Sequence, residues 1–221
     1  MPERETNRPA DLFTGGDRSD EIRVPDLDPT RLTARLKAVL GSRPRRVIGP
    51  DTRVPAAVLI LFVYRGHEPS LVFTKKTETV PHHKGQFAFP GGVVRAHDGS
   101  RIETALREAE EEIGLDPAAV EIVGLFDDTP TNASNFVITP VVGLCGSEPA
   151  FRPDGREIER VVEIPLRHLL DPAWFREEWW ERDGRPHPVA FFTCGEDVVW
   201  GATARILQNL FDAVFPGIWR S

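Results

Sequence analysis

Residues 91–115 read GGVVRAHDGSRIETALREAEEEIGL, a glycine pair followed by a segment crowded with carboxylates. Residues advance by about 100° around an α-helix, so the apolar side chains of this segment share one narrow stripe. That stripe consists of Ile102, Ala105, Leu106, Ala109 and Ile113. Glu108, Glu111 and Glu112 gather on the adjacent face, and Gly114 is placed to end the helix. The pattern predicts a helix with one face in the core and a strongly acidic face beside it.

The acidic face predicts a binding site for a divalent cation. Like charges at helical spacing repel by about 0.2–0.5 kcal/mol per pair, and hard cations such as Mg²⁺ prefer oxygen ligands. Arg107 lies one turn before Glu111 and can hold part of the cluster. Gly91 and Gly92 allow a tight turn that brings a backbone carbonyl to the metal. The alternative is a solvated acidic helix face, which leaves the glycine pair and the arginine unexplained.

This stretch resembles the Nudix box, whose second half is matched by residues 107–115 at every defined position. The first half departs from the box. Asp98 stands where the pattern counted from Gly92 has a glutamate, and eight residues instead of seven separate it from Arg107. The one-residue insertion resembles the coenzyme A diphosphatase branch of the Nudix hydrolases.

Flanking segments extend the resemblance to about residues 30–214. Residues 83–92 read HKGQFAFPGG, which is similar to the upstream signature of the branch, and the downstream matches are FVITPVVGL at 136–144, EIPL at 163–166, LLDP at 169–172 and WGATA at 200–204. Departures from the branch are Arg95 in place of the usual Asp, together with Lys76 and Lys84. Since Arg95 lies near the metal turn, it would either alter metal affinity or add a phosphate contact.

The resemblance implies a hydrolase that uses Mg²⁺ or Mn²⁺ to cleave the diphosphate of coenzyme A or an acyl derivative into 3′,5′-ADP and 4′-phosphopantetheine. It implies that Glu108 and Glu112 bind the metal directly and that the Gly92 carbonyl completes the shell. Glu111 would bind metal or act through water, and Arg107 would orient the carboxylates. Two alternatives stay open: another substrate such as ADP-ribose or NADH, and a Nudix-like binding or regulatory domain without catalysis.

A general base is expected on a loop far from the box, and Glu157 is the first candidate, with Glu159 second. Glu157 as a mere surface charge is the alternative. By resemblance His83 and Gln86 recognise the substrate, although His83 could equally cap or pack. Lys76, with its neighbour Lys75, would meet phosphates or lie at the surface.

Asp98, the tryptophans and the oligomeric state carry open interpretations. Asp98 would lie behind the metal ligands or form a loop Asx-turn. The tryptophans Trp174, Trp179 and Trp180 are expected in the core or at a dimer contact, with stacking on a nucleobase as the alternative. A homodimer is left open, because Nudix proteins are often dimers.

Composition narrows the class of protein. The net charge of −7 argues against a nucleic-acid surface, which is normally basic. No apolar run approaches the roughly 20 residues of a membrane span, and the N-terminus lacks a secretory apolar segment. Cys145 and Cys194 could form one bridge, but free thiols in a reducing cytoplasm are expected. These features agree with a soluble cytoplasmic enzyme, and the resemblance implies a small nucleotide substrate.

Along the chain, residues 1–26 are polar, lack periodicity and are expected to form a flexible arm, and residues 27–221 are expected to form the Nudix domain. Asp28 and Pro29 predict a helix start, and an apolar stripe near 207–214 predicts a closing helix. Strands are expected at 56–64, 71–74, 86–89, 121–126, 137–143 and 161–164. Together they predict an α/β/α sandwich on a mixed β-sheet.

Overall fold

The computed structural model describes residues 25–49, 52–78, 85–131, 135–146, 148–182, 184–195 and 197–219. His83 and residues 1–24 of the expected arm lie outside these ranges. The helices are α1 (Pro29–Ser42), α2 (Arg101–Ile113), α3 (Leu166–Leu170) and α4 (Gly201–Val214), with short 3₁₀ turns at Pro117–Ala119 and Pro172–Trp174. The strands are β1 (Val54–Arg65), β2 (Glu68–Lys76), β3 (Phe87–Ala88), β4 (Gly91–Val93), β5 (Val120–Leu125), β6 (Thr129–Pro130), β7 (Phe136–Cys145), β8 (Ile158–Pro165), β9 (Phe175–Arg182), β10 (Arg185–Cys194) and β11 (Asp197–Trp200).

The main sheet is mixed, as predicted. Its central path runs β3-β2-β1-β7-β5, while β4 pairs with β1, β6 with β7 and β8 with β2. The two longest neighbours, β1 and β7, run parallel over ten residue pairs, from Val54 opposite Phe136 to Val63 opposite Cys145. The other pairings of this sheet are antiparallel.

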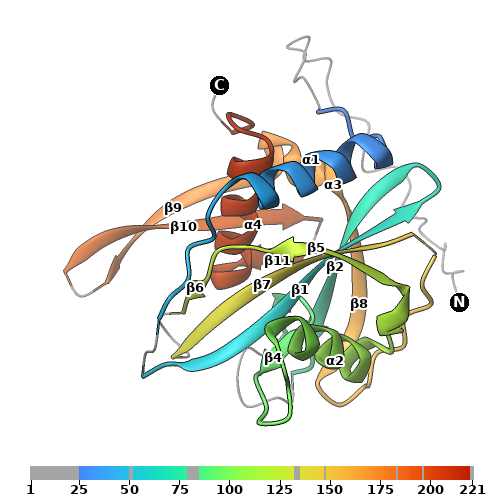
Figure 1. Cartoon of the computed structure of the whole chain (residues 1–221). Helices are drawn as coiled ribbons and strands as arrows, with labels where there is room; N and C mark the ends of the chain where they lie inside the picture. The colour runs from blue at the N-terminus through green and yellow to red at the C-terminus, as the bar shows by residue number, and fades with distance from the viewer. Residues whose placement is uncertain are drawn as a thin grey trace, which may run out of the picture.

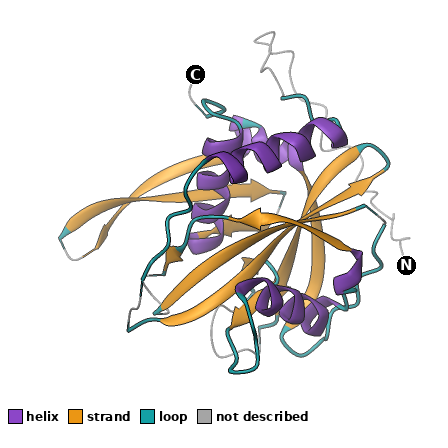
Figure 2. Cartoon of the chain, viewed as in Figure 1, coloured by secondary structure: helices purple, strands orange, loops and turns teal. Residues whose placement is uncertain are grey.

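Helices cover both faces of this sheet, with α1 and α4 on one side and α2 on the other (Figures 1 and 2). Two apolar clusters fill the two interlayer spaces. The larger one joins α1 and α4 to the sheet through side chains such as Leu36, Phe62 and Phe211. The smaller one joins α2 to the sheet through Ala109 and Leu59. This arrangement confirms the predicted α/β/α sandwich.

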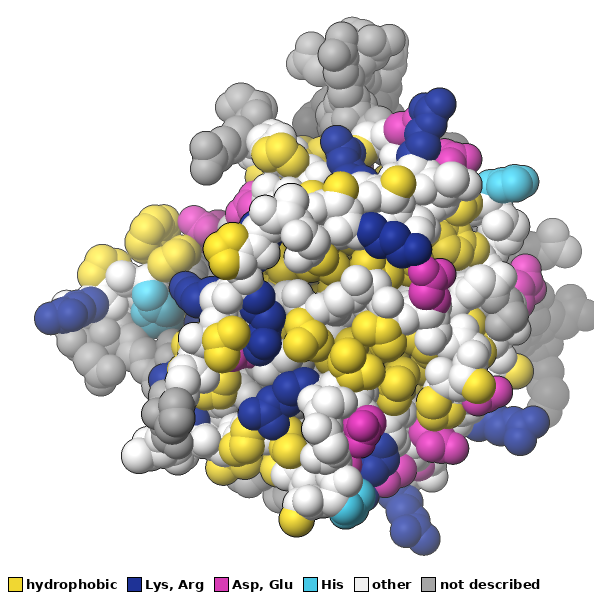
Figure 3. Space-filling model, in the orientation of Figure 1, with side chains coloured by type: hydrophobic (Ala, Val, Ile, Leu, Met, Phe, Trp, Pro, Cys, Tyr) yellow, Lys and Arg dark blue, Asp and Glu magenta, His cyan; other side chains and the backbone are white. Residues whose placement is uncertain are grey.

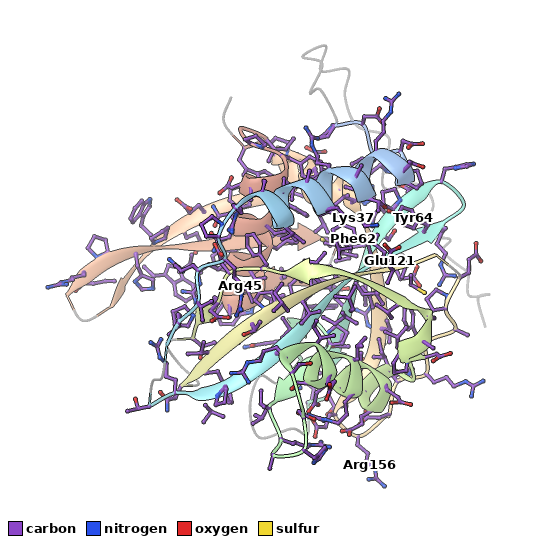
Figure 4. All side chains as sticks on the ribbon, in the orientation of Figure 1. Lys37, Arg45, Phe62, Tyr64, Glu121 and Arg156 are labelled. Atoms are coloured by element: carbon purple, nitrogen blue, oxygen red, sulfur yellow. The ribbon has the colours of Figure 1, made fainter. Side chains whose placement is uncertain are left out.

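Local sequence explains where the first helix begins. The carboxylate of Asp28 accepts hydrogen bonds from the backbone N–H groups of Thr30 and Arg31, and Pro29 occupies the first helical position. At its outer face, Lys37 pairs with Glu121 of β5 at 2.6 Å, and Figure 4 shows the two side chains between α1 and the sheet. The predicted start of this helix is confirmed.

A second sheet, with strand order β11-β10-β9, was not predicted. Its β9–β10 hairpin projects from the body of the molecule (Figure 1), while Phe192 of β10 is fully buried against α4. Trp179 is 67% exposed, so of the two positions expected for the tryptophans the core does not apply to it, and a dimer contact stays a prediction. The Trp180 ring makes tilted contacts with the rings of Phe191 and Trp200. A strand in a projecting hairpin has no layer to cover its outer part, so the side chains there stay exposed.

The glycine pair is placed by backbone geometry that other residues cannot adopt. Gly91 has φ of +156°, and a Cβ there would lie 2.4 Å from the Ala57 carbonyl oxygen. Without that Cβ, β4 can lie antiparallel against β1, with Gly91 opposite Val58 and Gly92 opposite Ala57. This pairing holds the Gly-Gly turn under α2.

Two other sequence expectations can be compared with the structure. Cys145 and Cys194 are thiols and not a disulfide, as predicted, and burial raises the pKa of Cys194 to about 11. Among the helices of the described ranges, none has the length and apolar character needed to span a bilayer.

Candidate active site

The acidic helix forms as predicted. The Ser100 hydroxyl accepts the backbone N–H of Glu103 at its start, and Gly114, with φ of +66°, ends it. Ala105, Ala109 and Ile113 are fully buried against the sheet. Since these side chains fix the rotation of α2, the neighbouring acidic face is turned toward the Gly-Gly turn of β4.

Arg107 is held in place from several sides. Its Nε and Nη2 atoms each donate to the Asp98 carboxylate at 2.9 Å, and Nη2 also donates to the Val93 carbonyl at 3.2 Å. Asp98 is almost fully buried and accepts further hydrogen bonds from the Thr104 hydroxyl and the Arg95 backbone N–H. The pKa of Asp98 is lowered chiefly by the Arg107 hydrogen bonds. Asp98 therefore anchors the arginine from behind.

From this fixed position, Arg107 reaches the acidic cluster. Its Nη1 atom lies 2.6 Å from Glu108 Oε1 and 3.4 Å from Glu111 Oε1. These contacts orient both carboxylates, which agrees with the role expected for Arg107. Figure 3 shows acidic and basic side chains next to one another over α2.

Glu112 is the most buried carboxylate of the cluster, with 8% of its side chain exposed. Its Oε2 atom accepts the Gly91 backbone N–H at 3.0 Å, and its Oε1 atom lies 3.6 Å from Lys76 Nζ. Burial raises the pKa of Glu112 to about 7; Lys76 and the Gly91 hydrogen bond oppose this rise, and Glu108 and Glu157 add to it. The carboxylate is therefore costly to keep charged unless a cation joins it.

Glu108 lies directly against the glycine pair. A Cβ on Gly92 would lie 2.6 Å from the Glu108 carboxyl carbon, closer than atoms can approach. A larger residue at this position would push the carboxylate away from the turn. The structure thus brings together Glu108, Glu112 and the backbone of Gly92, the three groups expected to bind the metal directly.

Glu111 points to a different partner. Both of its oxygens accept hydrogen bonds from the Arg95 guanidinium, at 2.7 and 2.8 Å. These hydrogen bonds are the main reason that the pKa of Glu111 is lowered. The sequence flagged Arg95 as a departure near the turn, but it did not reveal this pairing, which joins positions 16 residues apart.

The loop that carries Glu157 reaches the same region. The Asp154 backbone N–H donates to the Glu112 carbonyl at 3.0 Å, and the Asp154 carboxylate accepts the backbone N–H of Glu157 at 3.1 Å. Glu157 Oε2 lies 3.7 Å from Lys76 Nζ, so this lysine lies between Glu157 and Glu112. Figure 4 shows the neighbouring Arg156 beside the end of α2. Asp154 fixes the loop because its carboxylate also accepts the backbone N–H groups of Arg156 and Ile158, and this role was not predicted.

The other expected residues are only partly placed. Gln86 lies just before β3, and its backbone carbonyl accepts the Lys76 N–H at 3.0 Å. Glu159 pairs with Lys75 at 3.9 Å, on the strand that follows Glu157. His83 has no position among the described residues.

The donor chemistry of the cluster fits a divalent cation. Glu108, Glu112 and the Gly92 carbonyl are hard oxygen donors, and the buried Glu112 lacks full charge compensation. Within the described part of the chain, no three His, Cys, Asp or Glu side chains are already gathered as a complete metal site. Two of these carboxylates pair with arginines instead, Glu108 with Arg107 and Glu111 with Arg95.

A carboxylate-rich helix held against a Gly-Gly turn is an arrangement suited to a hydrolase that works with a divalent cation. Residues 53–185 match the family model described as NUDIX domain, so the chain belongs to the Nudix family and is a Nudix pyrophosphohydrolase. Nudix hydrolases generally require divalent metal ions.

Related proteins support the same assignment. The Nudix hydrolase NudL of Photorhabdus laumondii is 34% identical over 181 residues, which cover 81% of this chain and 94% of the relative. NudL of Salmonella newport is 36% identical over 186 residues, covering 83% and 96%. A solved MutT/nudix family protein from Enterococcus faecalis has a TM-score of 0.49 and 15% identity, with 82% of this chain and 73% of that chain covered. The assignment rests on the family match and the NudL relatives.

Proposed function

We propose that the protein hydrolyses the diphosphate linkage of coenzyme A or acyl-coenzyme A, giving 3′,5′-ADP and 4′-phosphopantetheine. The observation that carries this proposal is the cluster of Glu108, Glu112 and Lys76 around the Gly-Gly turn, to which the HKGQFAFPGG segment leads. The relationship to NudL over most of both chains is consistent with the coenzyme A branch.

Each group has a defined task in this proposal. Glu108, Glu112 and the Gly92 carbonyl hold the divalent cation, Mg²⁺ or Mn²⁺, and Glu111 joins them or acts through water. A bound cation neutralises the diphosphate, polarises a phosphoryl oxygen and makes water a better nucleophile. Arg107 keeps Glu108 oriented from its anchor on Asp98. Lys76, 21% exposed beside Glu112, is positioned to meet a phosphate, and Gln86 and His83 are proposed to recognise the rest of the substrate.

The test is a panel of substrates. Purified protein is incubated with Mg²⁺ or Mn²⁺ and with coenzyme A, ADP-ribose or NADH, and the products are identified by mass spectrometry. We expect 3′,5′-ADP and phosphopantetheine to form fastest. Preferred cleavage of ADP-ribose or NADH would overturn the coenzyme A assignment while keeping the diphosphate chemistry.

Glu157 is proposed as the general base that takes a proton from the attacking water on its carboxylate. Its side chain is 63% exposed, and its Oε2 atom faces Lys76 beside Glu112. Substituting Glu157→Gln removes the proton acceptor but keeps the shape, so kcat should fall by about 10²-fold. The measurement is the pH profile of kcat/KM for both proteins. The wild-type rate should fall on the acidic side, and this fall should be absent from the profile of Glu157→Gln.

Glu159→Gln is the matched control, because Glu159 has a similar exposure and also faces a lysine. Near-native turnover is expected for this variant. A large loss in Glu159→Gln combined with normal turnover in Glu157→Gln would transfer the role of the base to Glu159.

A further inference from the structure

Arg95 pairs with one carboxylate of the acidic cluster, that of Glu111. Its guanidinium binds both oxygens of Glu111, at 2.7 and 2.8 Å, and its Nη2 atom lies 3.8 Å from Glu108 Oε1. The backbone N–H of Arg95 is bound to the buried Asp98 at 2.8 Å, so the base of the side chain is fixed while its tip lies over α2. A cation can use Glu111 only after this pair opens.

Arg95 and Arg107 differ in how easily each can release its carboxylate partner. Arg107 is 16% exposed and is tied to Asp98 and to the Val93 carbonyl as well as to the cluster. Arg95 is 46% exposed, and its partner Glu111 is 45% exposed. Exposed ion pairs contribute little net stability, whereas an arginine binds phosphate through two parallel charge-assisted hydrogen bonds. Arg95 can therefore exchange its partner at low cost.

We propose that Arg95 exchanges Glu111 for the substrate diphosphate when the divalent cation binds, so that the cation and the diphosphate bind cooperatively. This inference rests on the proposed diphosphate hydrolase function. It gives Arg95, which departs from the branch pattern, a role in coupling the binding of the cation to the binding of the diphosphate.

The cooperativity follows from the charges. If the cation binds alone and takes Glu111, Arg95 loses its counter-ion. If the diphosphate binds alone and takes Arg95, the Glu111 carboxylate keeps only the 3.4 Å contact with Arg107 and repels the diphosphate. With one ligand bound, a charge of the pair therefore lacks its close partner, whereas with both ligands bound Arg95 and Glu111 each have one. Each ligand must then raise the affinity for the other by the same factor.

The experiment is a calorimetric titration of Mn²⁺ with and without adenosine 5′-(α,β-methylene)diphosphate, an analogue that cannot be hydrolysed at its bridge. In the wild-type protein we expect the analogue to tighten Mn²⁺ binding by about tenfold or more. Arg95→Gln should bind Mn²⁺ alone several-fold more tightly, because Glu111 no longer has to release Arg95 and keeps only the longer contact with Arg107. It should bind the analogue more weakly, and the coupling factor should shrink several-fold.

Arg65→Gln is the matched control. Arg65 makes the same two-atom pair with Glu163, at 2.9 and 2.5 Å, and is similarly exposed. It lies seven residues along β1 from Val58, the partner of Gly91, which is about 23 Å away at the rise of a strand. This variant removes the same charge from the protein and should keep the wild-type Mn²⁺ affinity and coupling.

The outcomes separate the inference from the function on which it rests. Unchanged Mn²⁺ affinity and unchanged coupling in Arg95→Gln would overturn the exchange, even if the wild-type protein hydrolyses coenzyme A. Equal shifts in the Arg95 and Arg65 variants would also overturn it, since they would reflect net charge alone. If the wild-type protein shows the coupling but cleaves no member of the substrate panel, the proposed substrate fails and the exchange stands. Failure of the wild-type protein to bind Mn²⁺ would overturn both.

Discussion

Substituting Glu112→Gln is expected to lower kcat for diphosphate hydrolysis by about 10³-fold while the protein stays folded. In the wild-type protein the Glu112 carboxylate accepts the Gly91 N–H at 3.0 Å. A glutamine keeps an oxygen for this hydrogen bond but lacks the negative charge that binds a cation. Steady-state rates at saturating metal, together with circular dichroism, measure the two effects. The loss should not be rescued by more metal if Glu112 is a direct ligand.

Glu110→Gln provides the control for this substitution. Glu110 lies on the same helix, two residues earlier, with an exposed side chain that points away from the cluster. The same change in charge and size should leave kcat within about twofold, because exposed positions without specific contacts tolerate such changes. Comparable losses in the two variants, or normal turnover in Glu112→Gln, would contradict the assignment of Glu112 to the metal site.

The sequence predicted the parts of the site that depend on local spacing. The stripe of Ala105, Ala109 and Ile113 fixes the rotation of α2, and Gly114 fixes its end, so the direction of the acidic face could be derived. The layered fold was predicted from the apolar strands for the same reason. The period of the hydrophobic pattern reports which face of an element is buried.

The charge network could not be predicted in the same way. Lys76 meets Glu112 and Glu157, which are 36 and 81 residues further along the chain, and these contacts exist only because β2 pairs with β8 under α2. The Arg95–Glu111 pair likewise depends on the path of the loop between β4 and α2. Contacts of this kind are set by tertiary structure, and a pattern of residue types carries no record of them.

The second sheet was missed for a different reason. In β9, which reads FREEWWER, charged residues come in runs of three and two around the aromatic ones, so the strand shows no sustained apolar period. Its stability comes from pairing with β10, whose Phe192 enters the core. The tryptophans were expected in the core or at a dimer contact, because large aromatic side chains usually pack against apolar surface, but the hairpin projects from the body of the molecule and leaves Trp179 exposed.

The free energy of unfolding of the metal-free protein is expected to depend on pH through Glu112. Burial raises the pKa of this carboxyl from its ordinary value of 4.5 to about 7. A raised pKa means that the folded state binds the proton more tightly than the unfolded state, so Glu112 stabilises the fold as pH falls from about 7 toward 4.5. Above pH 7 the buried charge costs the fold about 3 kcal/mol, at 1.36 kcal/mol per pKa unit.

Comparison with Glu112→Gln isolates this effect from the other carboxylates. In the presence of a chelator at pH 8, the glutamine variant should be more stable than the wild-type protein by up to about 3 kcal/mol, and the difference should shrink toward pH 5. Urea unfolding at a series of pH values measures it. Mg²⁺ should reverse the order at pH 8, because a bound cation stabilises the charged carboxylate of the wild-type protein alone. A difference that stays constant between pH 5 and 8 would show that Glu112 carries no such buried charge, and a reversal that fails to appear would remove Glu112 from the metal site.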